Sequence, residues 1–337
     1  MRRQIAFWAL LLVVAACGDG TGKVTLLAHD FFAVSDEVLA EFTEQTGIEV
    51  EVVLAGDAGL MVNQAILASG NPVADVIFGV DNTLLSRALD GDLFEEYRSP
   101  AMEDVPAPFD AGVMVTPIDF GDVCVNYDRA AFTTLPPPTT LTDLADPAYA
   151  GMLVVEDPGA SSPGLAFLLA TIAEFGEEGP YSWRDFWSDL RANEVLVATD
   201  WGVAYYGHFS GAGDGDRPLV VSYASSPGAE LIFSDPPPPE PSTATMTGGC
   251  FRQVEYAGIL RGTENRPEAE RLIDFMLSIR FQEDVPGNML VYPVRSDAAV
   301  PSWMGDPLPA PERTLTPAEI EAGRDRWLAE WTEIVLR

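Results

Sequence analysis

Asp57 is the side chain best placed in this sequence to contact a small ligand. It lies just past the apolar run Ile48 to Leu54, which is typical of a strand, and α/β proteins place their ligands at the carboxyl edge of such strands. Its carboxylate can accept a hydrogen bond from an amino group or face a cation. The alternative is a plain N-cap for the helical run Leu60 to Ala68, and both roles stay open.

Ser161 and Ser162 form a second candidate site with the opposite charge preference. They precede Pro163 and the apolar helical run Leu165 to Ile172. A helix that begins here presents free N–H groups, two hydroxyls and the positive end of its dipole, an arrangement that suits an anion. Simple N-capping is equally compatible with the sequence.

The sequence offers little machinery for catalysis. Serine catalysis needs a base, yet His29 and His208 are the only histidines and no G-x-S-x-G turn occurs. Acidic pairs are so plentiful that spacing does not test a glycosidase-type carboxylate pair. We therefore expect a binding protein, with an anchored hydrolase as the less favoured alternative that turnover of a substrate panel would reveal.

The first seventeen residues predict export and lipid attachment. Arg2 and Arg3 precede the apolar run Ile5 to Ala16, which is too short for a mature helix spanning a ~30 Å hydrocarbon layer. Val14-Ala15-Ala16-Cys17 resembles the bacterial lipobox, in which the cysteine becomes the lipid-modified N-terminus. The alternative is an ordinary signal peptide with an incidental cysteine.

Net charge and chain length limit the binding partners and the number of domains that the rest of the chain can have. Removal of Arg2 and Arg3 from the 19 basic residues leaves 17 against 52 acidic ones, a formal net charge of −35. Such a surface repels nucleic acid and attracts cations, although solubility alone would also explain it. About 320 residues exceed one ordinary core, so two domains are expected.

Cys124 and Cys250 are the only cysteines after Cys17. An even pair in an exported protein favours a disulfide over a metal site, and two free buried thiols would look the same in sequence. Neither histidine has ligand-like spacing to a cysteine, so no zinc site is expected.

Apolar runs and helical patterns alternate in two series, which predicts two α/β units with largely parallel sheets. The first series is strand 24–28, helix 35–45, strand 48–54, helix 60–68 and strand 75–79. The second is strand 152–155, helices 163–175 and 182–193, and strands 195–197 and 219–222. Two extended stretches, 113–127 and 250–257, pass between the units and suggest a hinge. A Cys124–Cys250 disulfide would cross-link these two stretches.

The C-terminal tail is expected to be a helix. Thr316, Pro317 and Glu319 form a capping box with proline at the first helical position. One apolar face then follows at helical spacing, which favours a core role over a site role for its tryptophans. That face consists of Ile320, Trp327, Trp331 and Ile334.

Several short motifs occur along the chain in a definite order. They are Ala74-Asp75-Val76 to Gly79-Val80-Asp81-Asn82, Glu156-Asp157-Pro158, Ser161-Ser162-Pro163-Gly164-Leu165, Trp201 with Ala204-Tyr205, Ser222-Tyr223 with Ser226-Pro227, Gln253-Val254-Glu255, Tyr292-Pro293-Val294, and Thr316-Pro317-Ala318-Glu319 with Glu330-Trp331. Each is weak alone. Their order and spacing together resemble the bacterial thiamine-binding proteins, the substrate-binding components of thiamine ABC transporters within the periplasmic-binding-protein superfamily.

The resemblance covers almost all of the chain after Cys17 and implies a fold. It implies a two-lobed α/β fold of the type II-like periplasmic-binding-protein kind, each lobe a mixed, mostly parallel sheet flanked by helices, with two hinge strands between the lobes. We expect residues 1–17 as signal peptide, 18–23 as a leash, 24–117 plus 256–337 as lobe 1, and 118–255 as lobe 2.

The resemblance also implies the ligand, which is thiamine or its mono- or diphosphate, with no cofactor and no catalytic residue. It assigns Trp201 and Tyr223 to the thiazolium, because an aromatic face attracts a flat cation by about 0.5–2 kcal/mol per contact. An ordinary core position is the alternative for each. The expected ligand-binding residues are His29, Asp57, Ala58, Gly59, Ser161, Ser162, Trp201, Tyr223, Ala224, Ser225, Ser226 and Pro227.

The chain departs from the family pattern at four positions. Ala58 stands where the family has glycine, and three family aromatics appear as His29, Ala229 and Leu290. We therefore expect a thinner aromatic cage, with lower affinity or a preference for a thiamine phosphate, a pyrimidine fragment or a related cation.

A ferric-ion binder is the main alternative within the same fold. Tyr205 and Tyr206 form a tyrosine pair, and His29 with Asp57 could complete a set of nitrogen and oxygen ligands. Adjacent residues on a helix point about 100° apart, which arranges this pair poorly around one ion.

The expected mechanism is capture by lobe closure, followed by delivery to an ABC permease and its ATPase. We expect a monomer that binds no nucleic acid and is held at the cell membrane by the lipid on Cys17. Its place would be extracytoplasmic, on the periplasmic side or the outer face.

Overall fold

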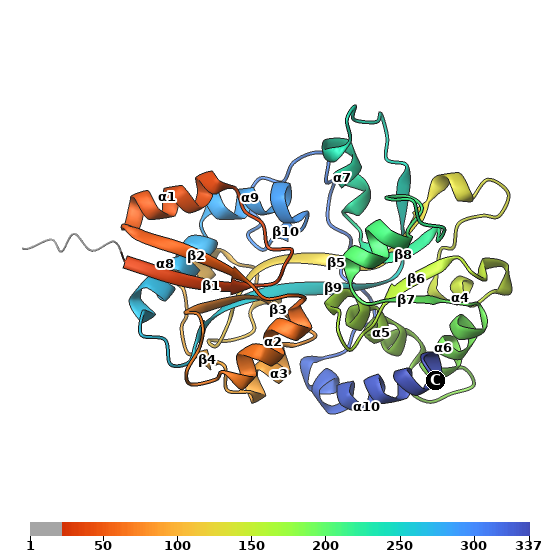
Figure 1. Cartoon of the computed structure of the whole chain (residues 1–337), viewed down its shortest axis with the longest axis horizontal. Coiled ribbons are helices and arrows are strands. Elements are labelled where there is room, and N and C mark those ends of the chain that lie inside the picture. The colour runs from red at the N-terminus through yellow and green to blue at the C-terminus, as the bar shows by residue number, and fades with distance from the viewer. Residues whose placement is uncertain (1–21) are drawn as a thin grey trace, which may run out of the picture.

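The computed structural model describes residues 22–337 (Figure 1). The expected signal peptide, Cys17 and residues 18–21 of the expected leash lie outside the described residues. The first strand begins at Gly22, two residues earlier than expected, so Gly22 and Lys23 belong to a strand and not to the leash.

Ten strands and ten α-helices make up most of residues 22–337. The strands are β1 (Gly22–Ala28), β2 (Ile48–Leu54), β3 (Val76–Asp81), β4 (Phe94–Glu95), β5 (Thr116–Asp128), β6 (Leu153–Glu156), β7 (Leu196–Ala198), β8 (Leu219–Tyr223), β9 (Thr243–Leu260) and β10 (Tyr292–Pro293). The α-helices are α1 (Asp36–Thr46), α2 (Ala58–Leu67), α3 (Leu85–Asp90), α4 (Leu141–Leu144), α5 (Ser162–Phe175), α6 (Trp183–Ala192), α7 (Ser226–Phe233), α8 (Arg266–Met276), α9 (Ile279–Met289) and α10 (Pro317–Val335).

Shorter helical turns complete these elements. They are η1 (Pro100–Asp104), η2 (Ala107–Phe109), η3 (Arg129–Ala131), η4 (Pro147–Tyr149) and the π-helix η5 (Val203–His208). The two predicted α/β series are confirmed in order and type, with ends that differ by one or two residues at most positions.

A single mixed sheet runs through the molecule in the order β2-β1-β3-β9-β5-β8-β6-β7. At one end β1 pairs in parallel with β2 and β3, and at the other β6 pairs in parallel with β7 and β8. We name the half built on β1, β2 and β3 lobe 1, and the half built on β6, β7 and β8 lobe 2. Helices flank both halves, so the expected two-lobed α/β architecture is confirmed (Figure 1).

Two long antiparallel strands, β5 and β9, connect the lobes. β9 pairs with β3 of lobe 1, β5 pairs with β8 of lobe 2, and the two pair with each other along most of their length. Their register shifts between Val123 and Val125 of β5, where the facing residue in β9 changes from Phe251 to Met246. Cys124 and Cys250 form a disulfide at this shift, so the bridge joins the connecting strands to each other.

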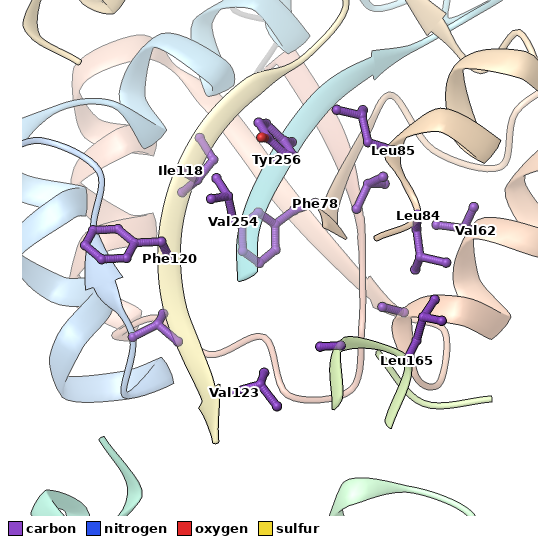
Figure 2. Packing of buried hydrophobic residues seen from close by; sticks show 14 of the residues in the cluster. Val62, Phe78, Leu84, Leu85, Ile118, Phe120, Val123, Leu165, Val254 and Tyr256 are labelled. Atoms are coloured by element: carbon purple, nitrogen blue, oxygen red, sulfur yellow. The ribbon is translucent and has the colours of Figure 1, made fainter. Parts of the chain in front are cut away.

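A continuous apolar core packs against both faces of these strands. Figure 2 shows part of it, with Ile118 and Phe120 on β5 and Val254 and Tyr256 on β9. Leu165 of α5 belongs to the same cluster. Lobe 1 and lobe 2 therefore share buried apolar surface at their junction.

The C-terminal helix, which belongs to the residues 256–337 expected in lobe 1, lies against both lobes. α10 contacts α6 of lobe 2 as well as α3 of lobe 1. Trp331 is fully buried, with its ring centroid 5.5 Å from that of Trp187 on α6. The apolar face predicted from the sequence is largely buried, and Trp331 on it packs on lobe 2.

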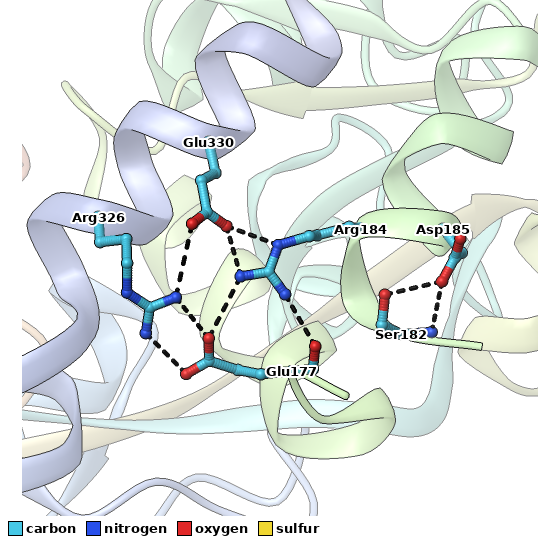
Figure 3. A network of polar contacts seen from close by, with 6 residues as sticks. All are labelled: Glu177, Ser182, Arg184, Asp185, Arg326 and Glu330. Carbon is cyan, nitrogen blue, oxygen red and sulfur yellow. Dashed lines mark hydrogen bonds and ion pairs between the residues drawn. The ribbon is translucent and has the colours of Figure 1, made fainter. Parts of the chain in front are cut away.

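Ion pairs reinforce the contact between α10 and lobe 2 (Figure 3). Arg184 Nε donates to Glu330 Oε2 at 2.6 Å, and Arg326 Nη2 donates to Glu177 Oε1 at 2.8 Å. Hydrogen bonds from Arg326 lower the pKa of Glu177 to about 2. Charged networks of this kind add modest stability at an exposed edge, so the buried tryptophans carry most of the packing.

Within residues 22–337, no helix combines the length and apolar character needed to cross a membrane.

We predict that Trp331→Ala lowers the free energy of unfolding by about 3–5 kcal/mol, because it empties a fully buried aromatic site. Urea denaturation measures the loss. Leu67→Ala is the control, since Leu67 is 90% exposed and should change stability by less than about 0.5 kcal/mol. Equal effects of the two substitutions would show that α10 does not pack on α6 as described.

Candidate functional site

A cavity of about 370 Å³ lies at the junction of the two lobes. Its volume falls in the range of small-molecule sites. Eight of the residues expected from the sequence lie on its wall: His29, Asp57, Ala58, Ser162, Trp201, Tyr223, Ser225 and Ser226. The structure therefore brings together side chains that lie almost two hundred residues apart in the chain.

Four expected residues do not lie on this wall. Gly59 and Ser161 line a second, smaller cavity behind it. Ala224 donates its backbone N–H to Asp122, and Pro227 is buried in the first turn of α7. Ser161 is the N-cap residue of α5, so the following serine, Ser162, is the one that reaches the main cavity.

Asp57 occupies the N-cap position of α2 without a side-chain cap hydrogen bond. Its Oδ1 instead accepts from the backbone N–H of Ser162 at 3.2 Å, across the cleft between the lobes. Burial raises the pKa of Asp57, although the Ser162 N–H opposes that shift. The first N–H of α5, expected to hold an anion, is therefore occupied by a carboxylate of the protein itself.

A buried hydrogen-bond chain lies beneath Asp57. Ser162 Oγ and Gln253 Nε2 both donate to Asp81, and Tyr223 Oη donates to Gln253 Oε1 at 2.7 Å. Asp81 itself is fully buried. Tyr223 is thereby fixed to β9 of the hinge, and Ser162 of lobe 2 is tied to β3 of lobe 1.

His29 and Glu255 form the second charged group on the wall. His29 Nε2 lies 3.1 Å from Glu255 Oε1, and His29 Nδ1 accepts from the Phe31 N–H at 3.2 Å. Burial is the largest influence on the pKa of His29 and lowers it, but the charge and hydrogen bond of Glu255, together with the charges of other nearby carboxylates, give a net upward shift. Asp119 faces Glu255 across the β5–β9 ladder, and burial together with that charge raises its pKa well above the usual range.

Trp201 stands just before η5 and forms the centre of an aromatic wall. Its ring stacks on Tyr205 at 4.9 Å, and its Nε1 donates to Ser222 Oγ at 2.9 Å. Ser222 Oγ in turn lies 2.9 Å from Ser226 Oγ. The ring is thus held by packing on one side and by a hydrogen bond at its edge.

The expectation of a thin aromatic cage is not matched by the cavity. Phe31, Tyr206 and Phe233 also line it, and the ring centroids of Phe31 and Tyr206 lie 5.2 and 5.5 Å from that of Trp201. These residues come from a loop, the π-helix and the end of α7, so no strand or helix period marked them. Leu290 does line the wall, as an aliphatic residue.

Other wall residues were also absent from the expected set. Gln253 and Glu255 belong to a motif quoted for the family resemblance, and their alternation along β9 points both at one face. Residues 288–291, at the end of α9, complete the wall and carried no comparable signal.

The tyrosine pair considered for iron is split between two environments. Tyr206 lines the cavity, whereas Tyr205 is buried behind Trp201. Their ring planes are 85° apart. Within residues 22–337, no group of three or more His, Cys, Asp or Glu side chains is arranged to hold a metal ion.

We predict a pH-dependent stability term from Asp81. Burial raises its pKa to about 6, against hydrogen bonds from Thr83 and Gln253, while the reference value is 3.8. The stability from the protonated carboxyl is therefore fully present below about pH 4 and is lost as the pH rises through about 6. The difference in pKa corresponds to about 3 kcal/mol.

Asp81→Asn mimics the neutral form at all pH values. The free energy of unfolding of the wild type minus that of the variant should fall by about 3 kcal/mol between pH 4 and 7, measured by urea denaturation. Asp36→Asn, on the exposed start of α1, is the control. A difference that stays constant with pH would contradict the assignment.

Comparison with known proteins shows which family has this architecture. The sequence profile described as Bacterial extracellular solute-binding protein matches residues 71–312. A thiamine-binding periplasmic protein of Salmonella typhimurium is 30% identical over 335 residues, covering 97% of this chain and 98% of the relative. A solved periplasmic thiamin binding protein is 27% identical with a TM-score of 0.81, covering 94% of this chain and 96% of its own.

A more distant structure shows the fold alone. Iron-bound HitA from Pseudomonas aeruginosa is 20% identical with a TM-score of 0.75, covering 93% of this chain and 99% of its own. The fold of this chain agrees with that of the solved periplasmic thiamin binding protein over most of its length. This chain therefore belongs to the bacterial extracellular solute-binding protein family, with thiamine-binding periplasmic proteins among its relatives.

Proposed function

We propose that this protein captures thiamine outside the cytoplasm and delivers it to an ABC permease. The observation that carries the proposal is one cavity wall that combines carboxylates with an aromatic cluster. Asp57 and Glu255 face the same space as Trp201. The full-length similarity to thiamine-binding periplasmic proteins supports the same ligand.

The wall offers a partner for each part of thiamine. The thiazolium is a flat cation, which carboxylates attract by charge and aromatic faces attract through their quadrupole. Gln253, Ser225 and Ser226 supply amide and hydroxyl groups for the aminopyrimidine and the hydroxyethyl tail. Since no bond of the ligand has to break, binding and release suffice for the function.

Closure of the lobes provides a means of capture. Ser162 of α5 contacts Asp57 and Asp81 of lobe 1, so the cleft is bridged beside the cavity. The connecting strands β5 and β9 are continuous with both lobes and form the hinge of this motion. The closed form is then presented to the permease by a monomer that the lipid on Cys17 keeps at the membrane.

A ferric ion is the second candidate, supported by the phenol of Tyr206 and the imidazole of His29 on one wall. Thiamine is favoured because Tyr205 is packed behind Trp201, and the phenol of Tyr223 on the same wall already donates to Gln253. Visible charge-transfer absorbance on adding ferric iron, without a response to thiamine, would reverse the order.

We predict that titration calorimetry detects binding in the order thiamine, then thiamine monophosphate, then thiamine diphosphate. The reason is that the wall is acidic and Asp57 already accepts from the N-terminus of α5, so each added phosphate is repelled. Equal or higher affinity for the diphosphate would contradict this charge argument. Absence of heat with all three ligands would overturn the thiamine proposal.

Trp201→Ala should weaken thiamine binding between about 2-fold and 30-fold, the range expected for one cation–π contact. The same calorimetry measures the loss. Trp303→Ala is the matched control, because Trp303 is half-buried and lies off the cavity wall. If both variants bind like the wild type, Trp201 is a packing residue only.

Asp57→Asn should reduce thiamine affinity by about tenfold or more while leaving the neutral aminopyrimidine fragment of thiamine unaffected. The amide oxygen can still accept from Ser162, so the substitution removes charge and retains the hydrogen bond. Competition binding measures the change in affinity for each of the two ligands. Equal losses for both would place Asp57 against the pyrimidine instead of the thiazolium.

A further inference from the structure

A second cavity, of about 40 Å³, lies behind the main one where α2, α3, α5 and α10 meet. Its wall takes Asn63 and Arg87 from lobe 1, Ser161 from lobe 2, and Arg324 from α10. Three parts of the structure that are far apart in sequence therefore meet around one small space.

Arg324 is the central residue of this cavity. It is 4% exposed, and its Nε and Nη1 have no hydrogen-bond partner among residues 22–337. The nearest carboxylate oxygens, on Glu321 and Asp325, lie 3.7 Å away, beyond hydrogen-bond distance. Asp325 is almost fully exposed and Glu321 is 38% exposed, so solvent screens both carboxylates and the buried guanidinium is only partly compensated.

Other buried polar atoms around the cavity also lack partners within the described chain. They are Arg87 Nε, Ser161 Oγ and Asn63 Oδ1. Orphaned polar atoms are costly in a folded protein, and several around one cavity indicate an unseen occupant. Two guanidinium groups and a hydroxyl are donors, which favours an anion, and a water molecule beside it would satisfy the Asn63 oxygen.

The volume of the cavity and the charges around it agree with the binding of an anion. About 40 Å³ holds roughly three water-sized groups, enough for a halide and accompanying water. The positive charge around the cavity comes from the guanidinium groups of Arg87 and Arg324, since Asp57 already accepts from the first N–H of α5. In a chain with a net charge of −33, this is a local concentration of positive charge.

We propose that this cavity binds a small inorganic anion, with chloride as the reference ion, and that the bound anion ties lobe 1, lobe 2 and α10 together. The site is separate from the main cavity, because Ser162 alone lines both. The proposal does not depend on the identity of the transported ligand.

Crystals of the full exported chain grown in sodium bromide test the site directly. We expect an anomalous scattering peak within hydrogen-bond distance of Arg324 Nη1 and Ser161 Oγ. A cavity that contains only water in this experiment would overturn the proposal. So would displacement of bromide by the phosphate of thiamine monophosphate, since the cavity would then be part of the ligand site.

Thermal unfolding tests the stabilising role. At equal ionic strength, the wild type should melt about 2 °C or more higher in chloride than in isethionate, which is too large for the cavity. Arg324→Gln should abolish the difference and Ser161→Ala should reduce it. Arg313→Gln, at an exposed pair with Glu174, should retain it.

Ser161→Ala keeps the experiment decisive if Arg324→Gln fails to fold, because it removes a single hydroxyl from the wall. A chloride effect of the same size in Ser161→Ala, Arg313→Gln and the wild type would show that the ion acts elsewhere.

Discussion

The cleft depends on carboxylates that are withdrawn from water with few cations beside them. Asp57, Asp81, Asp119, Glu156 and Glu255 surround the lobe junction, and His29 is the one basic side chain of residues 22–337 within ion-pair distance of any of them. Isolated buried charge is costly, so each carboxylate must be neutralised, accept hydrogen bonds or face an opposite charge. Burial raises the pKa of Asp119 and Glu156 well above the usual range, which favours their neutral forms. Asp81 accepts hydrogen bonds, and the charge that remains on Asp57 and Glu255 is what a cationic ligand would compensate.

The fold places these carboxylates at the junction of the two lobes, where movement of one lobe relative to the other can expose them to solvent. β9 carries Gln253 and Glu255 on the cavity wall, so one of the two connecting strands also forms part of the site. The Cys124–Cys250 bridge joins these two strands to each other where β5 pairs with β8 of lobe 2. α10 adds a third connection, because it contacts α3 of lobe 1 and α6 of lobe 2. Closure therefore has to preserve or slide the α10 contact, and the small cavity at Arg324 lies at that position.

Much of the fold was readable because strong local signals agreed with it. Periodicity and caps located most elements, as at α1, which ends at Gly47 in a left-handed conformation. The packing of α10 on lobe 2 was not readable, because an apolar face does not say which partner it meets. Only part of the site could be predicted, because a sequence pattern does not show which side chains meet in the folded protein. Asp57 and Ser162 lie on the wall, but Ser161, the N-cap residue with extended backbone, lines the smaller cavity instead. Phe31, Tyr206 and Phe233 reach the cavity from irregular segments, where no period predicts direction.

A crystal structure of the exported chain grown with thiamine tests the central claim most directly. The account predicts thiamine in the interlobe cavity, with the thiazolium within about 6 Å of the Trp201 ring and beside Asp57 or Glu255, and with Ser162 closed onto lobe 1. A cavity that stays empty at saturating thiamine, or thiamine bound away from Trp201 and both carboxylates, would contradict it.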